Sequence, residues 1–431
     1  MKKKILKVIE KPFVRNVIVL SSGTAAAQII AMLLTPIITR LYGPYAYGLM
    51  GTFMAIISII GPVAALTFPI AIVLPKKDSE ARELVKLSFQ ISIFISVLTA
   101  LVLLVFSQHI IKILDLESIA PFLYLIPVAM LLSGILQIIE QWLIRTKQFS
   151  ISARATVLQA ILVNGGKIGI GLFYPMASIL IIFTAIRQGL KAFLLFLLDK
   201  DSRKLLSTIS KKKVSYKKLV YKYRDFPMFR APEVLINAIS SNIPTLLLTV
   251  FFGPASAGFY AIGRTVLNIP SQLIGKSVGD VFYPRISEAA NNNETLTRLI
   301  LKATFSLAAI GAIPYGIIII FGPILFSFAF GEEWVIAGEY ARWIALWSYI
   351  GFMNRPSVMS IPVLSAQKFH LLYTIFMLII RVSVMVIGFY IYESDIIAVA
   401  LFGVSGALLN IGLIFIVVLI SKKFDRLHGN S

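Results

Sequence analysis

Long apolar runs recur along the whole chain, and short segments that contain charged residues, glycine or proline separate them. A helix that crosses a bilayer needs about 20 consecutive, mostly apolar residues. The pattern predicts twelve such helices, at residues 17–39, 47–73, 87–108, 120–143, 155–173, 177–198, 227–252, 257–283, 299–320, 337–362, 370–391 and 396–420. An even number of spans places both termini on the same side of the membrane.

The composition supports a membrane protein. Of the 431 residues, 58% are hydrophobic and 14% are charged, whereas soluble domains average about 45–50% apolar and about 25% charged residues. A soluble fold of this composition would lack the polar surface that keeps a protein in solution. We therefore predict an all-α polytopic membrane protein.

Few residues of the chain are suited to metal or catalytic chemistry. It has no cysteine, and its three histidines, His109, His370 and His428, are far apart in the sequence, so we predict neither a metal site nor a cofactor. The run Gly165-Gly166-Lys167 lacks the earlier glycine and the following serine or threonine of a phosphate-binding loop. No nucleophile stands in a pattern with a base, and we expect no enzyme activity.

Lysine and arginine predict the orientation. The net charge is +21, and basic residues of a membrane protein collect in its cytoplasmic loops. Basic residues are frequent in the N-terminal tail, in the loops after the second and fourth spans, and in residues 199–225, which hold ten of them. The alternate loops hold Arg40 and Lys112 but collect acidic residues. We therefore expect both termini to be cytoplasmic.

The two halves of the chain share an internal repeat. Residues 42–50 (YGPYAYGLM) align with residues 252–260 (FGPASAGFY), and further matches follow in the same order: Pro75-Lys76 with Pro284-Arg285, and Lys147-Gln148-Phe149 with Gln367-Lys368-Phe369. Six spans in each half make the repeats parallel, as in one class of secondary transporters. We predict an N-terminal six-helix bundle at 1–198, a connection at 199–225 and a C-terminal six-helix bundle at 226–431.

The connection contains an amphipathic basic segment. Its apolar residues recur at helical spacing with basic residues between them, and they are Tyr216, Leu219, Val220 and Tyr223. Such a segment beside a membrane usually lies on the anionic leaflet. Aromatic and basic interleaving also occurs in nucleic-acid binding, but the flanking spans favour membrane lipids as the partner, and we expect no nucleic acid.

Several ionisable residues lie deep within the predicted spans. Charged residues in a membrane are costly and by default face a hydrated interior. Arg230, Arg342 and Arg355 lie near span ends, where a long side chain can reach water. That explanation is weaker for the deeper residues Lys167, Arg187, Arg264 and Arg381. Because deep basic residues outnumber acidic ones, the pathway should favour an anion.

The span at 257–283 carries a polar stripe with a spacing of four residues. Steps of four place neighbours on one slowly turning face of a helix. Polar pairing between helices is the alternative explanation for such stripes. The candidate cavity residues are Arg264, Lys276, Asn268, Gln272, Arg187, Lys191, Lys167, Arg381, Asn237 and Gln28. Glu233 and Asp280 are candidates for ion coupling, although Asp280 lies four residues from Lys276 and the two could form a local ion pair.

Three segments resemble a known family. The runs TPIITRLYGPYAYG (Thr35 to Gly48), AIVLPKKDSEA (Ala71 to Ala81) and NIPTLLLTVFFGPASAGFYAIGRTVLNIPSQLIGKSVGDVFYPR (Asn242 to Arg285) resemble Wzx-type polysaccharide-unit flippases. These belong to the multidrug/oligosaccharidyl-lipid/polysaccharide (MOP) superfamily. Many relatives carry an Arg-Tyr-Glu triplet where this chain has Thr67-Phe68-Pro69, so a role of those charges does not carry over.

The resemblance implies a two-bundle transporter of the bacterial inner membrane. It would move undecaprenyl-diphosphate-linked oligosaccharide units to the outer leaflet by alternating access, without a cofactor or ATP hydrolysis. The polysaccharide polymerase and assembly proteins of the pathway would be its protein partners. On this interpretation Arg264 and Lys276 bind the diphosphate, and Asn268 and Gln272 contact sugar hydroxyls.

Other functions remain open at the level of the sequence. A MATE-like exporter of small molecules is the nearest, although its usually cationic substrates would favour acidic cavity residues. A membrane glycan polymerase or ligase would usually need a large external domain, and the longest external loop here is about 321–336. A peptidoglycan-precursor flippase would be expected to have about fourteen helices.

Overall fold

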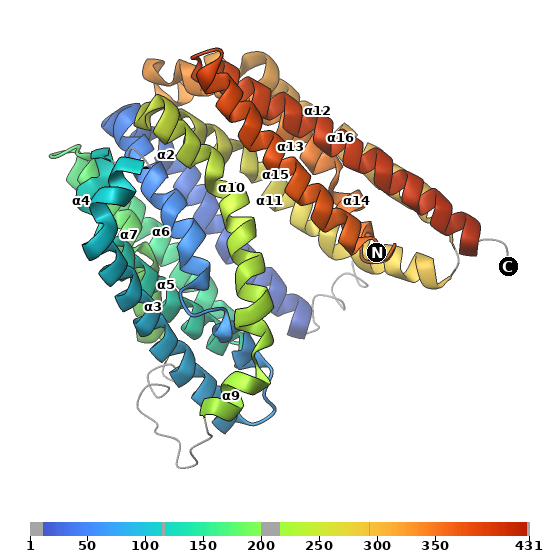
Figure 1. The fold of residues 1–431 in the computed structure, drawn as a ribbon, viewed down its shortest axis with the longest axis horizontal. Coiled ribbons are helices and arrows are strands. Elements are labelled where there is room, and N and C mark those ends of the chain that lie inside the picture. The colour runs from blue at the N-terminus through green and yellow to red at the C-terminus, as the bar shows by residue number, and fades with distance from the viewer. Residues whose placement is uncertain (1–11, 114–116, 200–215, 293, 429–431) are drawn as a thin grey trace. The chain divides into compact units, whose positions relative to one another are not determined.

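The fold is described from a computed structural model of the chain. The structure describes residues 12–113, 117–199, 216–292 and 294–428, and within these ranges it describes side chains for all residues except 12–18, 20, 110, 113, 270, 272–281 and 428. The chain divides into two units, unit 1 at Met1–Val250 and unit 2 at Phe251–Ser431. Figure 1 shows that helices make up both.

Unit 1 contains two long helices and several shorter ones. Its α-helices are α2 (Pro12–Ile60), α3 (Asp78–Ile113), α4 (Ala120–Leu123), α5 (Ile126–Arg145), α6 (Phe149–Gly171), α7 (Ala177–Leu198), α9 (Tyr216–Lys222) and α10 (Ala231–Phe252). Short 3₁₀ turns lie at Gly61–Val63, Phe68–Val73 and Glu117–Ile119, and one π-helical turn lies at Phe226–Arg230. The helix α2 packs on α6 and α7, and α5 packs on α3 and α7.

Unit 2 is built from six α-helices within the described residues. They are α11 (Pro254–Asn291), α12 (Leu296–Phe330), α13 (Val335–Met353), α14 (Arg355–Ser360), α15 (Gln367–Tyr390) and α16 (Asp395–His428), with a 3₁₀ turn at Glu332–Trp334 before α13. The helix α13 packs on α11, α12 and α16, and α15 lies beside α16 (Figure 1).

The all-α polytopic membrane fold is confirmed. Among the described residues, eight segments are long and apolar enough to cross a membrane. Two predicted spans, 17–39 and 47–73, overlap the same segment, Ser21–Val63, because α2 continues through a bend. The predicted spans at 155–173, 257–283 and 337–362 correspond to α6, α11 and α13 with α14, which are not among the eight. Lys167 in α6 and Glu339 and Arg342 in α13 lower the mean hydropathy of these helices.

Large apolar side chains remain exposed along the spans. Val105 of α3 is 68% exposed, Phe328 of α12 is 82% exposed and Leu371 of α15 is 60% exposed. In water such surfaces would drive association, whereas in a bilayer they face lipid chains of similar polarity. The exposure therefore agrees with a multi-pass membrane protein.

The internal repeat is visible in the backbone. Gly43 has φ 69° and ψ 173°, and Gly253 has φ 86° and ψ 174°. This region of φ and ψ is accessible to glycine and essentially closed to residues with a Cβ. A proline follows each glycine, and Pro254 begins α11, which suits the first turn of a helix. Both halves thus bend in the same way at the aligned motif.

A second turn of the repeat lies two residues from its predicted register. Lys147 and Ser365 both have positive φ, 59° and 53°. The next residues, Gln148 and Ala366, donate backbone N–H groups to carbonyls five residues earlier, at Leu143 and Ile361. Lys147 is therefore equivalent to Ser365, and the predicted match of Lys147-Gln148-Phe149 with Gln367-Lys368-Phe369 is shifted.

The repeat diverges after the shared bend. The span predicted at 47–73 ends as an α-helix at Ile60, because Pro62 and Pro69 lack backbone N–H groups and the chain turns at Leu66 and Thr67, which have positive φ. In unit 2, α11 continues as one helix to Asn291. Pro75 therefore lies in a loop before α3, whereas its counterpart Pro284 lies within α11.

The division between the units falls later than the sequence boundary at 225/226. Helix α10 is grouped with unit 1, and a hydrogen bond of 2.6 Å joins Thr249 Oγ1 to Thr52 Oγ1 of α2. The division of the structure into two units and the division of the sequence into two repeats thus differ by one helix, α10. The bundles at 1–198 and 226–431 remain a prediction about the repeat. Of the connection at 199–225, residues 200–215 lie outside the described residues.

Candidate functional site

Helix α11 carries the polar stripe that the sequence predicts. The backbone is helical from Pro254 to Asn291, so residues spaced by four lie on one turning face. Arg264 and Asn268 are half-buried on this face. The side chains of Gln272, Lys276 and Asp280 lie outside the described residues, and their parts in binding or coupling stay predictions.

In unit 2, Arg381 of α15 is held between two aromatic rings. Its guanidinium carbon lies 4.6 Å from the ring centroid of Trp347 on α13 and 5.5 Å from that of Phe402 on α16. The two rings meet edge to face, with centroids 5.2 Å apart. A guanidinium over such faces is attracted by the ring quadrupole. The aromatic rings thus fix the direction of a half-buried positive charge.

Tyr260 lies near enough to both Arg381 and Arg264 to be affected by their charges. Its side chain is 1% exposed, and its ring packs edge to face on Phe402 at 6.4 Å. Arg264 follows one helical turn later, and the charges of both arginines act on the phenol of Tyr260. We call Arg264, Arg381, Tyr260, Trp347 and Phe402 the arginine cluster. It joins residues from α11, α13, α15 and α16.

The arginine cluster has an unused hydrogen-bond donor. The Nε of Arg381 is buried and makes no hydrogen bond within the described part of the chain. A buried guanidinium donor without a partner is costly. The cluster therefore presents positive charge and at least one donor to a ligand that would supply an acceptor.

A second polar group in unit 2 lies around Tyr315 of α12, which is fully buried. Its hydroxyl forms a hydrogen bond of 2.9 Å with Ser271 Oγ of α11. The charge of Arg355 acts on the same phenol. Arg355 begins α14, so its position at a helix end agrees with the sequence, and it adds a positive charge near α11.

In unit 1, Lys167 of α6 is 8% exposed. Its Nζ lies 3.3 Å from Met50 Sδ of α2 and 3.4 Å from Thr184 Oγ1 of α7. Among the described residues, no carboxylate lies within ion-pair distance of it. The nearby cation is Arg187 of α7, whose charge acts on Lys167.

Lys191 has a different environment from Arg187, although the two lie four residues apart. Its Nζ donates to Glu140 Oε1 of α5 at 2.6 Å. The sequence did not single out Glu140, because a lone acid in an apolar span gives no sign of its partner. Lys191 therefore makes one of the polar contacts between helices that were the alternative to a cavity role.

The remaining candidates are dispersed. Gln28 is half-buried on α2, and Asn237 is exposed on α10. Glu233, a candidate for ion coupling, accepts two hydrogen bonds of 2.9 Å from Arg230 at the start of α10. In the described part of the chain, no group of three or more histidine or acidic side chains could hold a metal ion.

The basic connection packs on unit 1 through α9. Leu219 is 1% exposed and Tyr223 is 7% exposed, and both belong to a core with Phe68, Leu84 and Trp142. Lys222 and Tyr223 donate hydrogen bonds to Glu80 at the start of α3. The bond to Glu80 raises the pKa of Lys222. The connection is therefore attached to the helix that follows the first basic loop.

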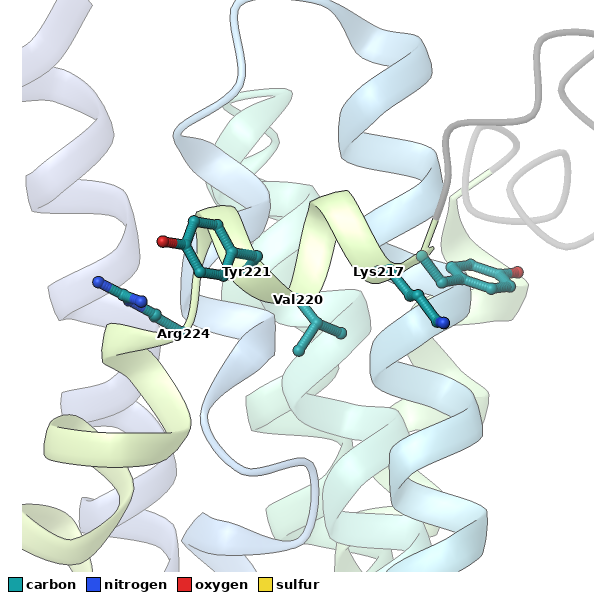
Figure 2. Close-up of a pocket in the computed structure, with 5 residues that line it drawn as sticks. Lys217, Val220, Tyr221 and Arg224 are labelled. Atoms are coloured by element: carbon teal, nitrogen blue, oxygen red, sulfur yellow. The ribbon is translucent and has the colours of Figure 1, made fainter.

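The opposite face of α9 is exposed and basic. Tyr216, Lys217, Val220, Tyr221 and Arg224 line a shallow hollow. Figure 2 shows Lys217, Val220 and Tyr221 on α9 and Arg224 on the segment that follows it. The Arg224 guanidinium lies 4.5 Å from the Tyr221 ring centroid. This face matches the amphipathic pattern of the sequence.

Thr67 lies at the position where the resemblance to Wzx-type flippases implied a charged triplet in many relatives. It has φ 58°, is 2% exposed and donates its hydroxyl to the carbonyl of Phe226 at 3.0 Å. In this chain the position therefore joins the loop before Phe68 to the π-helical turn before α10.

Solved structures of transporters share this fold. A lipid II flippase, MurJ, in an inward closed conformation has a TM-score of 0.70 and 14% identity, over 95% of this chain and 90% of that one. An inward-facing multidrug resistance MATE family transporter of the MOP superfamily has a TM-score of 0.69 and 13% identity, over 95% of this chain and 99% of that one. The MATE transporter VcmN of Vibrio cholerae has a TM-score of 0.60 and 15% identity, over 97% of each chain. At these identities the similarity shows the fold alone.

The sequence comparisons identify the family. No curated protein matches the chain. The family of polysaccharide biosynthesis proteins matches residues 37–338, a range that includes the bend at Gly43, the buried Lys167 and the polar stripe of α11. This all-α membrane chain therefore belongs to the polysaccharide biosynthesis protein family.

Proposed function

We propose that the chain is a flippase of the bacterial inner membrane. It moves undecaprenyl-diphosphate-linked oligosaccharide units from the cytoplasmic to the outer leaflet for the synthesis of O-antigen, capsule or exopolysaccharide. The observation that carries the proposal is the arginine cluster, a partly buried group of positive charge in a membrane unit of a polysaccharide biosynthesis protein.

The chemistry of the cluster suits a diphosphate. Arginine presents planar donors that match phosphate oxygens and is less strongly hydrated than an ammonium group. Charge-assisted bonds of this kind are about twice as strong as neutral ones. The aromatic contacts at 4.6 Å and 5.5 Å hold Arg381 in one orientation before the ligand arrives, which lowers the entropy lost on binding.

A phosphate would also satisfy the unpaired hydrogen-bond donor of the arginine cluster. The Nε of Arg381 has no protein acceptor in the described residues, and a phosphate oxygen would accept from it. Arg264, whose charge acts on the same Tyr260, would contact the same headgroup. The polyprenyl chain would stay among lipid chains, which the exposed apolar surface of the spans allows.

A MATE-like exporter of small molecules is the second candidate, and the similarity to MATE transporter structures supports it. The charges oppose it for cationic substrates. Glu140 and Glu233 are already paired with Lys191 and Arg230, whereas the arginine cluster is positive. An anionic substrate is therefore the better match.

The test is complementation of a flippase-deficient strain, with membrane abundance measured in parallel. We expect Arg381→Ala to abolish surface polysaccharide at normal abundance. Arg285→Ala is the matched control, because Arg285 is an exposed arginine of the same unit that pairs with Glu294. Full export by an Arg264→Ala, Arg381→Ala double variant would show that the cluster is structural and would favour another substrate.

A further inference from the structure

Helix α9 lies directly before a membrane span of unit 1. It ends at Lys222, and the apolar segment that contains α10 begins at Phe226. A segment next to the end of a span lies at the surface of the bilayer, where the basic and aromatic side chains of membrane proteins collect. The exposed side of α9 is therefore at the depth of the lipid headgroups.

The contacts of α9 with unit 1 fix which side of the helix is exposed. Leu219 is 1% exposed and Tyr223 is 7% exposed, and both belong to the core at this end of the unit. The Tyr223 hydroxyl donates to Glu80 Oε1 of α3 at 3.0 Å, and Lys222 donates to the same oxygen. The helix cannot turn its other side toward the core without losing these contacts.

The exposed side of α9 carries positive charge that no carboxylate neutralises within the described residues. Lys217 and Arg224 line the hollow shown in Figure 2. In the described part of the chain, neither of them forms an ion pair, and neither does the exposed Lys218. The acid next to them in the sequence, Asp225, is exposed and forms no ion pair with these residues either. This side of α9 is thus suited to an anionic ligand.

Apolar and aromatic side chains lie between and beside these charges. Val220 is 39% exposed and Tyr221 is 69% exposed, and the Arg224 guanidinium lies 4.5 Å from the Tyr221 ring centroid. Met228 and Phe229, in the π-helical turn before α10, are 60% and 68% exposed. A nucleic acid would leave these apolar groups in water, whereas the boundary between headgroups and acyl chains matches both kinds of surface.

We propose that the lipid face of α9, which consists of Tyr216, Lys217, Val220, Tyr221 and Arg224, binds the headgroup of an anionic phospholipid. Lys217 and Arg224 supply the charge that attracts the phosphate, because basic residues next to a span are drawn to anionic lipids. Val220 and the two tyrosine rings lie against the glycerol and the upper acyl chains. The site lies within unit 1, and it is separate from the arginine cluster and independent of the proposed substrate.

The experiment measures lipid binding at α9 in the full-length protein. The chain has no cysteine, so Lys218→Cys places one environment-sensitive dye beside the lipid face. The labelled protein, in a neutral detergent, is titrated with short-chain phosphatidylglycerol and with phosphatidylcholine of the same acyl chains. We expect tighter binding of phosphatidylglycerol, and an affinity that falls as salt is added because the charges are exposed.

Variants in the labelled background assign the binding to the lipid face. Lys217→Gln and Arg224→Gln should each weaken phosphatidylglycerol binding about five-fold and together about twenty-five-fold, from about 1 kcal/mol for each basic residue near an anionic surface. The charge-conserving Lys217→Arg, Arg224→Lys variant should bind as the labelled parent does. The matched control is Arg298→Gln, Lys302→Gln, which removes two exposed basic residues of α12 and should leave the affinity unchanged.

Three results would overturn the inference. Equal affinities for the anionic and the zwitterionic lipid would show that charge is not recognised. Equal affinities of the parent and the Lys217→Gln, Arg224→Gln variant would place the lipid elsewhere. Tighter binding of a single-stranded oligonucleotide than of phosphatidylglycerol would assign the face to nucleic acid. If the double variant is not recovered, the two single variants decide, and unchanged affinity in both rejects the site.

Discussion

The guanidinium of Arg381 lies 4.6 Å from the ring centroid of Trp347, on a neighbouring helix of unit 2. The contact places a positive charge where the surrounding span is apolar, and the Nε of Arg381 has no hydrogen-bond acceptor among the residues that the structure describes. An aromatic face stabilises the cation without neutralising it. Arg381 is thus held in place while it remains able to bind an anion.

Loss of this aromatic face should weaken substrate binding. A cation–π contact contributes about 0.5–2 kcal/mol, so Trp347→Leu should weaken the affinity for undecaprenyl diphosphate by about two- to thirty-fold. Trp347→Phe should retain more of the affinity than Trp347→Leu. Calorimetric titration of the purified variants measures this, and equal affinity in the wild type and Trp347→Leu would show that the ring does not orient Arg381.

The ion pair between Lys191 and Glu140 should be structural. Removal of one partner leaves an unpaired charge in a partly buried position between α5 and α7. Glu140→Gln should therefore lower the free energy of unfolding by about 1–3 kcal/mol. The melting temperature of the detergent-purified protein measures this effect. The double variant Glu140→Gln, Lys191→Gln should recover part of that loss. If the double variant is as unstable as the sum of the single variants, the two side chains do not act on each other.

The glycine at the start of α11 should resist substitution for conformational reasons alone. A Cβ at Gly253 would meet no atom within 4 Å, but φ is 86°. Gly253→Ala should therefore destabilise the protein by about 1–3 kcal/mol through backbone strain. Gly316→Ala is the matched control, since a Cβ at this helical glycine of α12 also meets nothing within 4 Å and should be neutral or stabilising. Equal melting temperatures of the two variants would contradict this explanation.

The orientation can be tested in the chain as it stands, because it contains no cysteine. Tyr221 is 69% exposed on α9, and Glu333 is exposed between α12 and α13. Tyr221→Cys should react with an impermeant maleimide only from the cytoplasmic face, and Glu333→Cys only from the outer face. The reverse labelling pattern would overturn the topology with cytoplasmic termini.

The fold follows from the sequence to a large extent because the bilayer requires long apolar helices. The break between the spans at 17–39 and 47–73 appears in the structure as the bend at Gly43, and the repeated Gly-Pro pair marks its counterpart at Gly253. The structure differs from the predicted spans where prolines and local turns end a helix before its apolar run ends. Hydropathy continues to residue 73, but the α-helix stops at Ile60, and the apolar residues after it pack as 3₁₀ turns.

The candidate site was predicted only in part. The depth of Arg264, Arg381 and Lys167 within apolar spans made them visible, since charges there are costly. Tyr260 and Arg264 are four residues apart, a spacing that predicts neighbouring side chains on one face of a helix. Trp347 and Phe402 gave no such signal, because aromatic residues are common in membrane spans and their meeting with Arg381 depends on how three helices pack.

The most direct test of the central claim is flipping by purified protein in vesicles. A fluorescent oligosaccharide on undecaprenyl diphosphate would be reconstituted with the wild type or with an Arg264→Gln, Arg381→Gln variant, and its arrival in the opposite leaflet measured by quenching. We expect the wild type to move this lipid, the variant to move it no faster than protein-free vesicles, and neither to move the same oligosaccharide on uncharged undecaprenol. Equal rates for the variant and the wild type, or equal rates for the charged and uncharged lipids, would contradict recognition of the diphosphate by the arginine cluster.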